Sequence, residues 1–174
     1  MKVLAKRFVR CCRGAVALEF ALTAPLLSVM LMGVVELSNY MTVIRKIDAA
    51  AHTAANLIAQ ETDLSNAELT TLFQAARYVI HPLDDNDLTL GASSVRYDDA
   101  DGTPSEDWNG SYNGGSVTNP VTIATGMGSA GESVIIVTAT FNYVPAFNMV
   151  LSGPFTVTET AVSRPRYINY VGLY

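Results

Sequence analysis

The sequence predicts an α+β protein with a long N-terminal transmembrane helix that continues into an exported helical stalk, a second short helix and a small antiparallel β-sheet. An apolar run from Ala15 to Val35 is followed by helical spacing of apolar residues up to Ile58. From Leu88 onward, short β-prone segments alternate with turn residues. Helices that precede a run of strands are typical of the α+β class. The expected division is a basic leader at 1–14, the transmembrane helix at 15–44, an exported helical region at 45–82 and a β domain at 83–174.

Charge is distributed unevenly along the 174 residues. Five of the 11 basic residues precede the apolar run, namely Lys2, Lys6, Arg7, Arg10 and Arg13. Because basic residues are retained on the cytoplasmic side, the N-terminus is expected in the cytoplasm and the C-terminal region beyond the membrane. The remainder of the chain is strongly acidic, with 16 acidic residues in the whole sequence. That balance argues against a nucleic-acid partner.

The apolar run has the length of a membrane span. At about 1.5 Å per residue, Ala15–Val35 crosses a hydrocarbon core of roughly 30 Å. No small-x-small cleavage site follows it, so a retained helix is favoured over a secretory signal peptide. Pro25 within the run is expected to kink the helix mildly at most. Cys11 and Cys12 both lie in the leader, so the exported part must fold without disulfides.

Beyond the membrane the helical pattern continues to Glu61 without Pro or Gly. A helix this long needs a domain of its own or a neighbouring helix to cover its apolar stripe. Ser65 and Glu68 form a capping box, which predicts the start of a second helix that ends at His81-Pro82.

The strands are expected in the last half of the chain. Leu88–Leu90 and Ser94–Asp98 are predicted as short strands, and Asp101-Gly102 as a hairpin turn before a return strand over 103–108. The segments 109–115 and 126–131 are expected to be loops, and 117–125 a short irregular strand. The strongest strand signals are those of 133–144 and 155–163, joined by an apolar loop at 145–153 that either caps the core or touches lipid headgroups.

The chain contains no pattern that predicts an enzyme, a cofactor or a metal site. The acidic segment Asp98–Gly102 invites a calcium interpretation, but Tyr97 and Trp108 stand where an EF-hand loop needs its first and last acidic ligands. We therefore interpret it as an acidic turn. His52 and His81 are far apart in sequence and lack the partners of a triad or metal site. Trp108, Tyr97, Tyr112 and Tyr143 are expected to be core and sheet-face residues.

Glu19 is the residue that most needs an explanation. An ionised carboxylate inside a bilayer costs a few kcal/mol or more, so an intramembrane acid indicates a functional site by default. Glu19 is the fifth residue after Gly14, which closes a leader that contains no acids. The simplest alternative is a local convenience, since an acid near a helix N-terminus is favoured by the helix dipole.

The stretch Arg13–Leu22, followed by Pro25-Leu26-Leu27 and Gly33–Leu37, resembles the N-terminal block of the TadE/TadG-like pseudopilins of the tight-adherence (Tad, Flp-pilus) machinery. The tail Thr158–Arg166 is similar to the closing strand of that family. The length of the chain fits the TadE/TadF-type minor pseudopilins best. The resemblance implies a location in the inner membrane with the C-terminal domain in the periplasm.

The resemblance also implies roles for individual residues. A prepilin peptidase would cut between Gly14 and Ala15, and Glu19 and Phe20 would act in subunit assembly. The new amino group of Ala15 would pair with Glu19 of a neighbouring subunit, and pairing would offset the desolvation of both charges. The implied partners are the peptidase, other Tad pseudopilins, the Flp pilin, the inner-membrane Tad platform proteins and the lipid bilayer.

Two questions remain open in the sequence. Glu36 is expected near the outer membrane–water boundary, either solvated or paired with a basic residue of another chain. The alternative to a cleaved pseudopilin is an uncleaved single-pass anchor that presents a periplasmic binding module.

Overall fold

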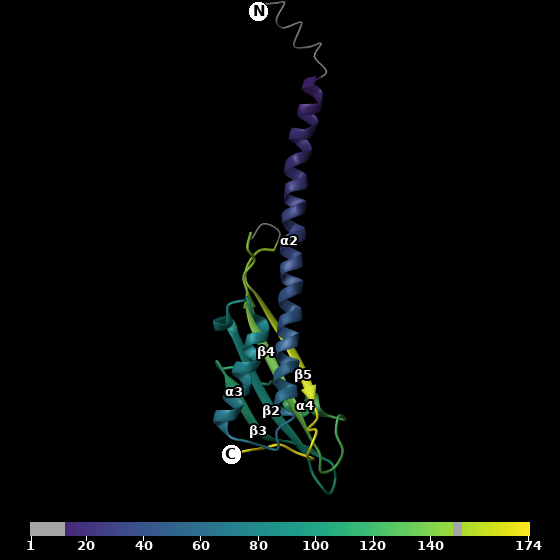
Figure 1. Cartoon of the computed structure of the whole chain (residues 1–174). Helices are drawn as coiled ribbons and strands as arrows, with labels where there is room; N and C mark the ends of the chain where they lie inside the picture. The colour runs from purple at the N-terminus through teal and green to yellow at the C-terminus, as the bar shows by residue number, and fades with distance from the viewer. Residues whose placement is uncertain (1–12, 148–150) are drawn as a thin grey trace, which may run out of the picture. The chain divides into compact units, whose positions relative to one another are not determined.

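The computed structural model describes residues 13–147 and 151–174 and confirms the α+β class (Figure 1). The chain forms two compact units. The first consists of the N-terminal residues up to Asn39 together with Pro145–Gly153, and the second of Tyr40–Val144 together with Pro154–Tyr174. Helix α2, Arg13–Ile58, is continuous and has Pro25 inside it. Its first part belongs to the first unit and its last part to the second.

The second unit is built on a four-stranded antiparallel sheet with the order β3-β2-β4-β5. The strands are β2 (Leu88–Tyr97), β3 (Pro104–Tyr112), β4 (Ser133–Tyr143) and β5 (Phe155–Ser163). Hairpins join β2 to β3 and β4 to β5, and β2 lies between β3 and β4. The pairing of β2 with β3 shifts register between Ser94 and Val95, which is a β-bulge or irregularity.

The last part of α2 and the helix α3, Asn66–Arg77, cover one face of this sheet. The stripe that α2 contributes is almost completely buried and consists of Val43, Ile47, Ala50, Ala51, Ala54, Ala55 and Ile58. This stripe is therefore covered by the chain's own domain, which is one of the two expected solutions.

Helix α3 begins where the capping box predicts. The Ser65 hydroxyl accepts from the Glu68 N–H at 3.3 Å, and the Glu68 carboxylate accepts from the Ser65 N–H at 2.8 Å. Leu69, Phe73 and Ala76 face the core. The helix passes into a 3₁₀ turn, η1 (Tyr78–Ile80), before the cis peptide bond of His81-Pro82. A second 3₁₀ turn, η2 (Asp85–Asp87), precedes β2.

The opposite face of the sheet carries a smaller cluster of Val95, Tyr97, Val134 and Ile136, closed by Ala124. Ala124 lies in the short helix α4, Pro120–Ala124. The sequence predicts an irregular strand here, and that prediction is wrong. Pro120 stands at the start of the helix, where its fixed φ fits and its missing N–H is not needed.

Two other strand predictions need correction. The two predicted strands, Leu88–Leu90 and Ser94–Asp98, form one strand, β2, which ends at Tyr97 and therefore excludes Asp98. Its pairing with β4 runs through Gly91, which lies against the backbone of Ser116. Strand β3 extends to Tyr112, through residues predicted as a loop. Its Gly110 lies against Leu69 of α3, which explains a small residue in a strand.

The C-terminal tail packs against β1 (Asp63–Leu64), β3 and the end of α2 in the second unit. Gly172–Leu173 (β6) pairs in parallel with β1, a pairing that the sequence does not predict. The tail is also held by the indole of Trp108, which donates to the Val171 carbonyl at 2.7 Å. The backbone N–H of Arg166 donates to the Ala59 carbonyl at 2.9 Å. These bonds connect the end of the chain to the end of α2.

Candidate functional site: the N-terminal part of helix α2

The first turn of α2 contains the predicted processing junction. The backbone from Arg13 onward is helical, so the Gly14–Ala15 bond lies in the first turn. The N–H groups of a first turn have no partners within the helix, and helix ends fray. The Gly14–Ala15 bond is the one that the predicted peptidase would cut. Whether it is cut remains a prediction.

Glu19 follows Ala15 by four positions, which places both residues on the same face of α2. Glu19 is exposed, and within residues 13–147 and 151–174 its carboxylate has no hydrogen bond or ion pair. Its backbone carbonyl accepts from the Thr23 hydroxyl at 2.9 Å. The carboxylate is therefore available to a group outside this chain.

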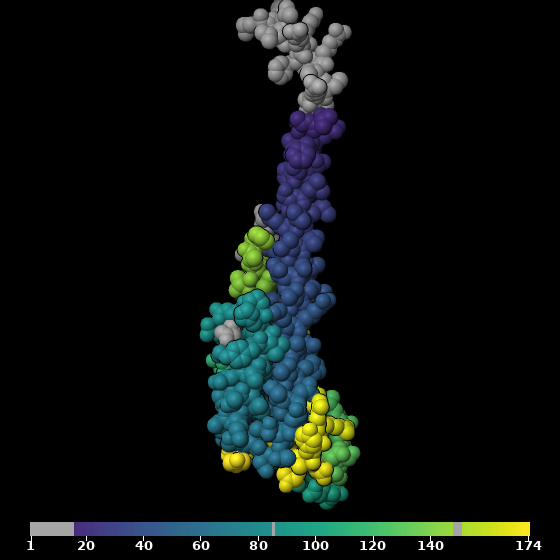
Figure 2. Space-filling view, in the orientation of Figure 1, coloured from purple at the N-terminus to yellow at the C-terminus, as the bar shows by residue number. Residues whose placement is uncertain are grey.

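Large apolar side chains surround Glu19 on the helix. Phe20 is 68% exposed, and Val16, Leu18 and Leu22 are exposed to a similar degree. Figure 2 shows this N-terminal stretch of α2 uncovered on the face in view. A helix that is hydrophobic all round needs lipid or other helices around it. By length and composition α2 qualifies as a candidate membrane span, over Val16–Ile58, and its most apolar window is unburied.

The hydroxyl groups in this stretch are satisfied inside the helix. Thr23 donates to Glu19 as described, and Ser28 donates to the Ala24 carbonyl at 2.8 Å. Hydroxyls bonded in this way add no unpaired donor to an apolar environment. Glu19 is thus set apart from the neighbouring polar residues, because its carboxylate remains unsatisfied in the described part of the chain.

Glu36 corrects a prediction. The sequence indicates a solvated acid or one paired with another chain, but the Glu36 side chain is fully buried. Its Oε1 accepts from the backbone N–H of Phe147 at 3.1 Å, and its Oε2 accepts from that of Leu151 at 3.0 Å. Both donors belong to the loop between β4 and β5, in the same unit as Glu36. The sequence could not predict this contact, because the donors are backbone groups far along the chain.

The same loop was expected to cap the core or touch headgroups through its apolar residues. Ala146, Phe147 and Leu151 are described, whereas Met149 and Val150 lie outside the described residues. Pro145 at the start of the loop is buried, whereas Ala146 and Phe147 are exposed, so these two side chains are not buried in a core.

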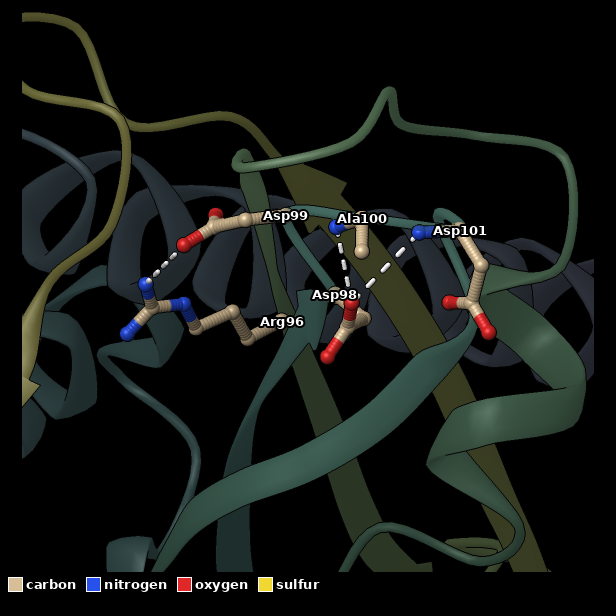
Figure 3. Close-up of polar contacts among 5 residues, drawn as sticks. All are labelled: Arg96, Asp98, Asp99, Ala100 and Asp101. Atoms are coloured by element: carbon tan, nitrogen blue, oxygen red, sulfur yellow. Dashed lines mark hydrogen bonds and ion pairs between the residues drawn. The ribbon is translucent and has the colours of Figure 1, made fainter.

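The acidic segment before β3 is a turn, as predicted (Figure 3). The Asp98 carboxylate accepts from the N–H of Ala100 at 2.8 Å and of Asp101 at 3.4 Å, so it is used within the turn. Asp99 pairs instead with Arg96 at 3.4 Å. Gly102 has φ +70°, a conformation that favours glycine. Among the described residues no group of three or more His, Cys, Asp or Glu side chains could hold a metal ion.

The remaining candidate residues have structural surroundings. Trp108, Tyr97 and Tyr143 are buried and Tyr112 is half-buried, which confirms them as core and sheet-face residues. His52 lies 3.6 Å from Asp48 on the exposed side of α2. The backbone carbonyl of His81 accepts from Lys46. The two histidines thus contact different residues on different elements.

Comparison with protein families supports the resemblance at the residues that carry it. The model of the TadE-like protein family matches residues 14–56, which begin at the glycine of the predicted junction and include nearly all the rest of α2. The match confirms the predicted similarity to TadE-like proteins and, with the candidate membrane helix, fits a single-pass membrane component of a Tad pilus system. A search of curated proteins and a search of solved structures each found no match.

Proposed function

We propose that the protein is a minor pseudopilin of a Tad pilus machine, inserted in the inner membrane by α2, cut after Gly14 and active in pilus assembly or initiation. The N-terminus faces the cytoplasm before cleavage, and the second unit lies in the periplasm. The observation that carries the proposal is the exposed Glu19 carboxylate, which has no partner in the described chain and lies one turn beyond Ala15 on an uncovered apolar helix.

Cleavage would create a charged partner for this carboxylate. The new amine of Ala15 is a positive charge at membrane depth, and leaving it unpaired there is costly. Glu19 of a neighbouring subunit neutralises it and fixes the axial position of one helix against the next. The exposed Phe20 lies beside Glu19 and packs in the same helix–helix contact. The partners are the prepilin peptidase, other Tad pseudopilins, the Flp pilin and the platform proteins of the inner membrane.

Mass spectrometry of the protein purified from cells with an active prepilin peptidase tests the processing step. We expect an N-terminus at Ala15. An N-terminus that remains at Met1 would contradict the proposal and leave the uncleaved anchor with a periplasmic module as the function.

Substitution of Glu19 tests the assembly step. Glu19→Gln keeps the size of the side chain and removes its charge, so we expect normal insertion and cleavage with loss of surface pili. The matched control is Thr23→Ala, one turn further along the same face, which should leave piliation intact. Full piliation with Glu19→Gln would show that the carboxylate has no role in assembly.

A further inference from the structure

The buried side chain of Glu36 is not explained by the proposed pairing of Glu19 with Ala15. Glu36 is the first residue after the apolar run, and a carboxylate at this place would ordinarily be solvated. It is instead 0% exposed and accepts two backbone N–H groups from the loop between β4 and β5. These two hydrogen bonds join both oxygens of the Glu36 side chain to the loop. The carboxylate therefore holds the described ends of this loop, 145–147 and 151–153, against α2.

The position of Glu36 along the helix sets the depth of the loop. From Val16 to Val35 the helix rises about 29 Å, which matches a hydrocarbon core of roughly 30 Å. Glu36 then lies at the outer boundary of that core. A backbone N–H bonded to its carboxylate must lie at the same level, within a few ångströms.

The side chains at this level are apolar and uncovered. Phe147 of the loop is 50% exposed, and on the helix Val34 is 66% and Leu37 54% exposed. Phe147 is thus an exposed apolar side chain whose backbone is bonded to Glu36, and Val34 and Leu37 are exposed apolar side chains near Glu36 on the helix. A phenyl ring at the lipid–water boundary is stabilised when it is buried among acyl chains and removed from water.

We infer that Phe147, at the described start of the loop between β4 and β5, is a second membrane contact of this protein, inserted in the outer boundary of the bilayer, with Glu36 as the residue that positions it. The carboxylate is tolerated at this depth because the loop covers it and supplies donors. We assign Phe147 to the lipid surface because its backbone is bonded to Glu36, which follows the exposed apolar part of α2 directly. The inference rests on the membrane insertion in the proposed function, but on neither cleavage nor pilus assembly.

Depth-dependent fluorescence quenching tests the inference. Cys11 and Cys12 are replaced by Ser in the full chain, which leaves no other cysteine. Phe147→Cys, Leu27→Cys and Tyr78→Cys are labelled separately with an environment-sensitive dye and reconstituted in vesicles of phosphatidylethanolamine and phosphatidylglycerol. Leu27, 61% exposed on α2, reports helix insertion. Tyr78, 72% exposed in the second unit, is the control to which we assign no lipid contact.

We expect a blue-shifted dye at position 147 that is quenched several-fold more strongly than at 78 by lipids with a nitroxide near the headgroup. The dye at 27, near the middle of the span, should be quenched by lipids with a nitroxide near the end of the acyl chain. Quenching at 27 but none at 147 overturns the inference and leaves the proposed function standing. Loss of quenching at 27 means that the helix is not inserted, which overturns both.

Glu36→Ala in the Phe147→Cys chain tests the positioning role. Without the carboxylate the two N–H groups lose their acceptor, so quenching at 147 should fall toward the value at 78 while quenching at 27 is unchanged. Asn39→Ala, an exposed polar residue of the same helix stretch, is the matched control. Unchanged quenching at 147 in Glu36→Ala would show that Glu36 does not hold the loop in the bilayer.

Discussion

Individual residues hold the C-terminal tail against the rest of the second unit, and Trp108 of β3 is the clearest example. Its ring is 8% exposed and its indole N–H bonds the Val171 carbonyl at 2.7 Å. In Trp108→Phe the carbonyl loses its donor and the smaller ring leaves space, so we expect a loss of about 1–3 kcal/mol in the free energy of unfolding. Chemical unfolding of the full chain in detergent, followed by circular dichroism, measures this change.

Tyr167→Phe is the control for Trp108→Phe, because Tyr167 is 74% exposed and surface substitutions usually change stability by less than about 0.5 kcal/mol. Equal stability of the two variants would mean that the indole bond does not secure the tail.

The capping box gives the second prediction at this scale. Hydrogen bonds from the backbone and side chain of Ser65 lower the pKa of the Glu68 carboxyl below its usual 4.5. A lowered pKa in the folded state means that Glu68 stabilises the fold above pH 4.5, and that this contribution is lost as the pH falls through the folded pKa. A double-mutant cycle of Ser65→Ala and Glu68→Gln should therefore show coupling at pH 7 that shrinks in more acidic solution.

The same cycle with Thr70→Ala in place of Ser65→Ala is the control, because residues two positions apart on a helix do not face each other. Coupling of Ser65 and Glu68 that stays constant from pH 7 to well below 4.5 would argue against an ionised cap.

These residues also show how far the sequence alone can predict a site. The capping box is predictable because its donors and acceptors lie within four residues of each other. The exposed Glu19 is predictable because its unusual feature is a charge in an apolar run. The partners of Glu36 are backbone amides more than 100 residues away. No side-chain pattern marks such donors, so the sequence indicates a solvated acid instead.

At the scale of elements, a glycine inside a strand can mark a place where another segment of backbone comes close. Gly91 lies inside β2, and a Cβ there would come 2.5 Å from the backbone of Ser116. The segment beyond β3 therefore crosses β2 at this glycine. We expect Gly91→Ala to cost about 1–3 kcal/mol of stability, since a backbone neighbour cannot rotate away. The measurement is the denaturant midpoint of the full chain.

Gly114→Ala separates this clash from backbone strain. A Cβ at Gly114 meets nothing within 4 Å, but its φ of +78° disfavours other residues, so we expect a loss of only about 1 kcal/mol. A smaller effect at Gly91 than at Gly114 would contradict the close approach.

The same reasoning explains which elements the sequence predicts. Strands β4 and β5 are predicted almost to the residue because their β-branched residues run without a glycine. The gap predicted in β2 covers residues 91–93, and Gly91 in this gap lies against the backbone of Ser116. The pairing of β1 with β6 joins two-residue strands from distant parts of the chain, and strands this short carry no periodicity to detect.

At the scale of the whole molecule, one helix serves two environments. Up to Leu37 its large apolar side chains are exposed, whereas from Val43 to Ile58 its apolar stripe is buried against the sheet and α3. The buried core of the second unit therefore includes the last part of α2. We expect a fragment of residues 40–174 to fold in aqueous buffer without detergent, because it retains the whole of this core.

A fragment that lacks the buried stripe of α2 provides the contrast. A fragment of residues 60–174 lacks the seven buried side chains from Val43 to Ile58, so the sheet face that they cover is exposed to water. This exposure lowers the free energy of unfolding by about 25 cal/mol for each Å² of apolar surface. We expect it to show no cooperative unfolding transition by circular dichroism, and a peptide of residues 40–59 added in trans to restore one. Cooperative unfolding of the shorter fragment at the same denaturant midpoint as 40–174 would mean that the sheet folds without α2, and that the helix serves only the membrane.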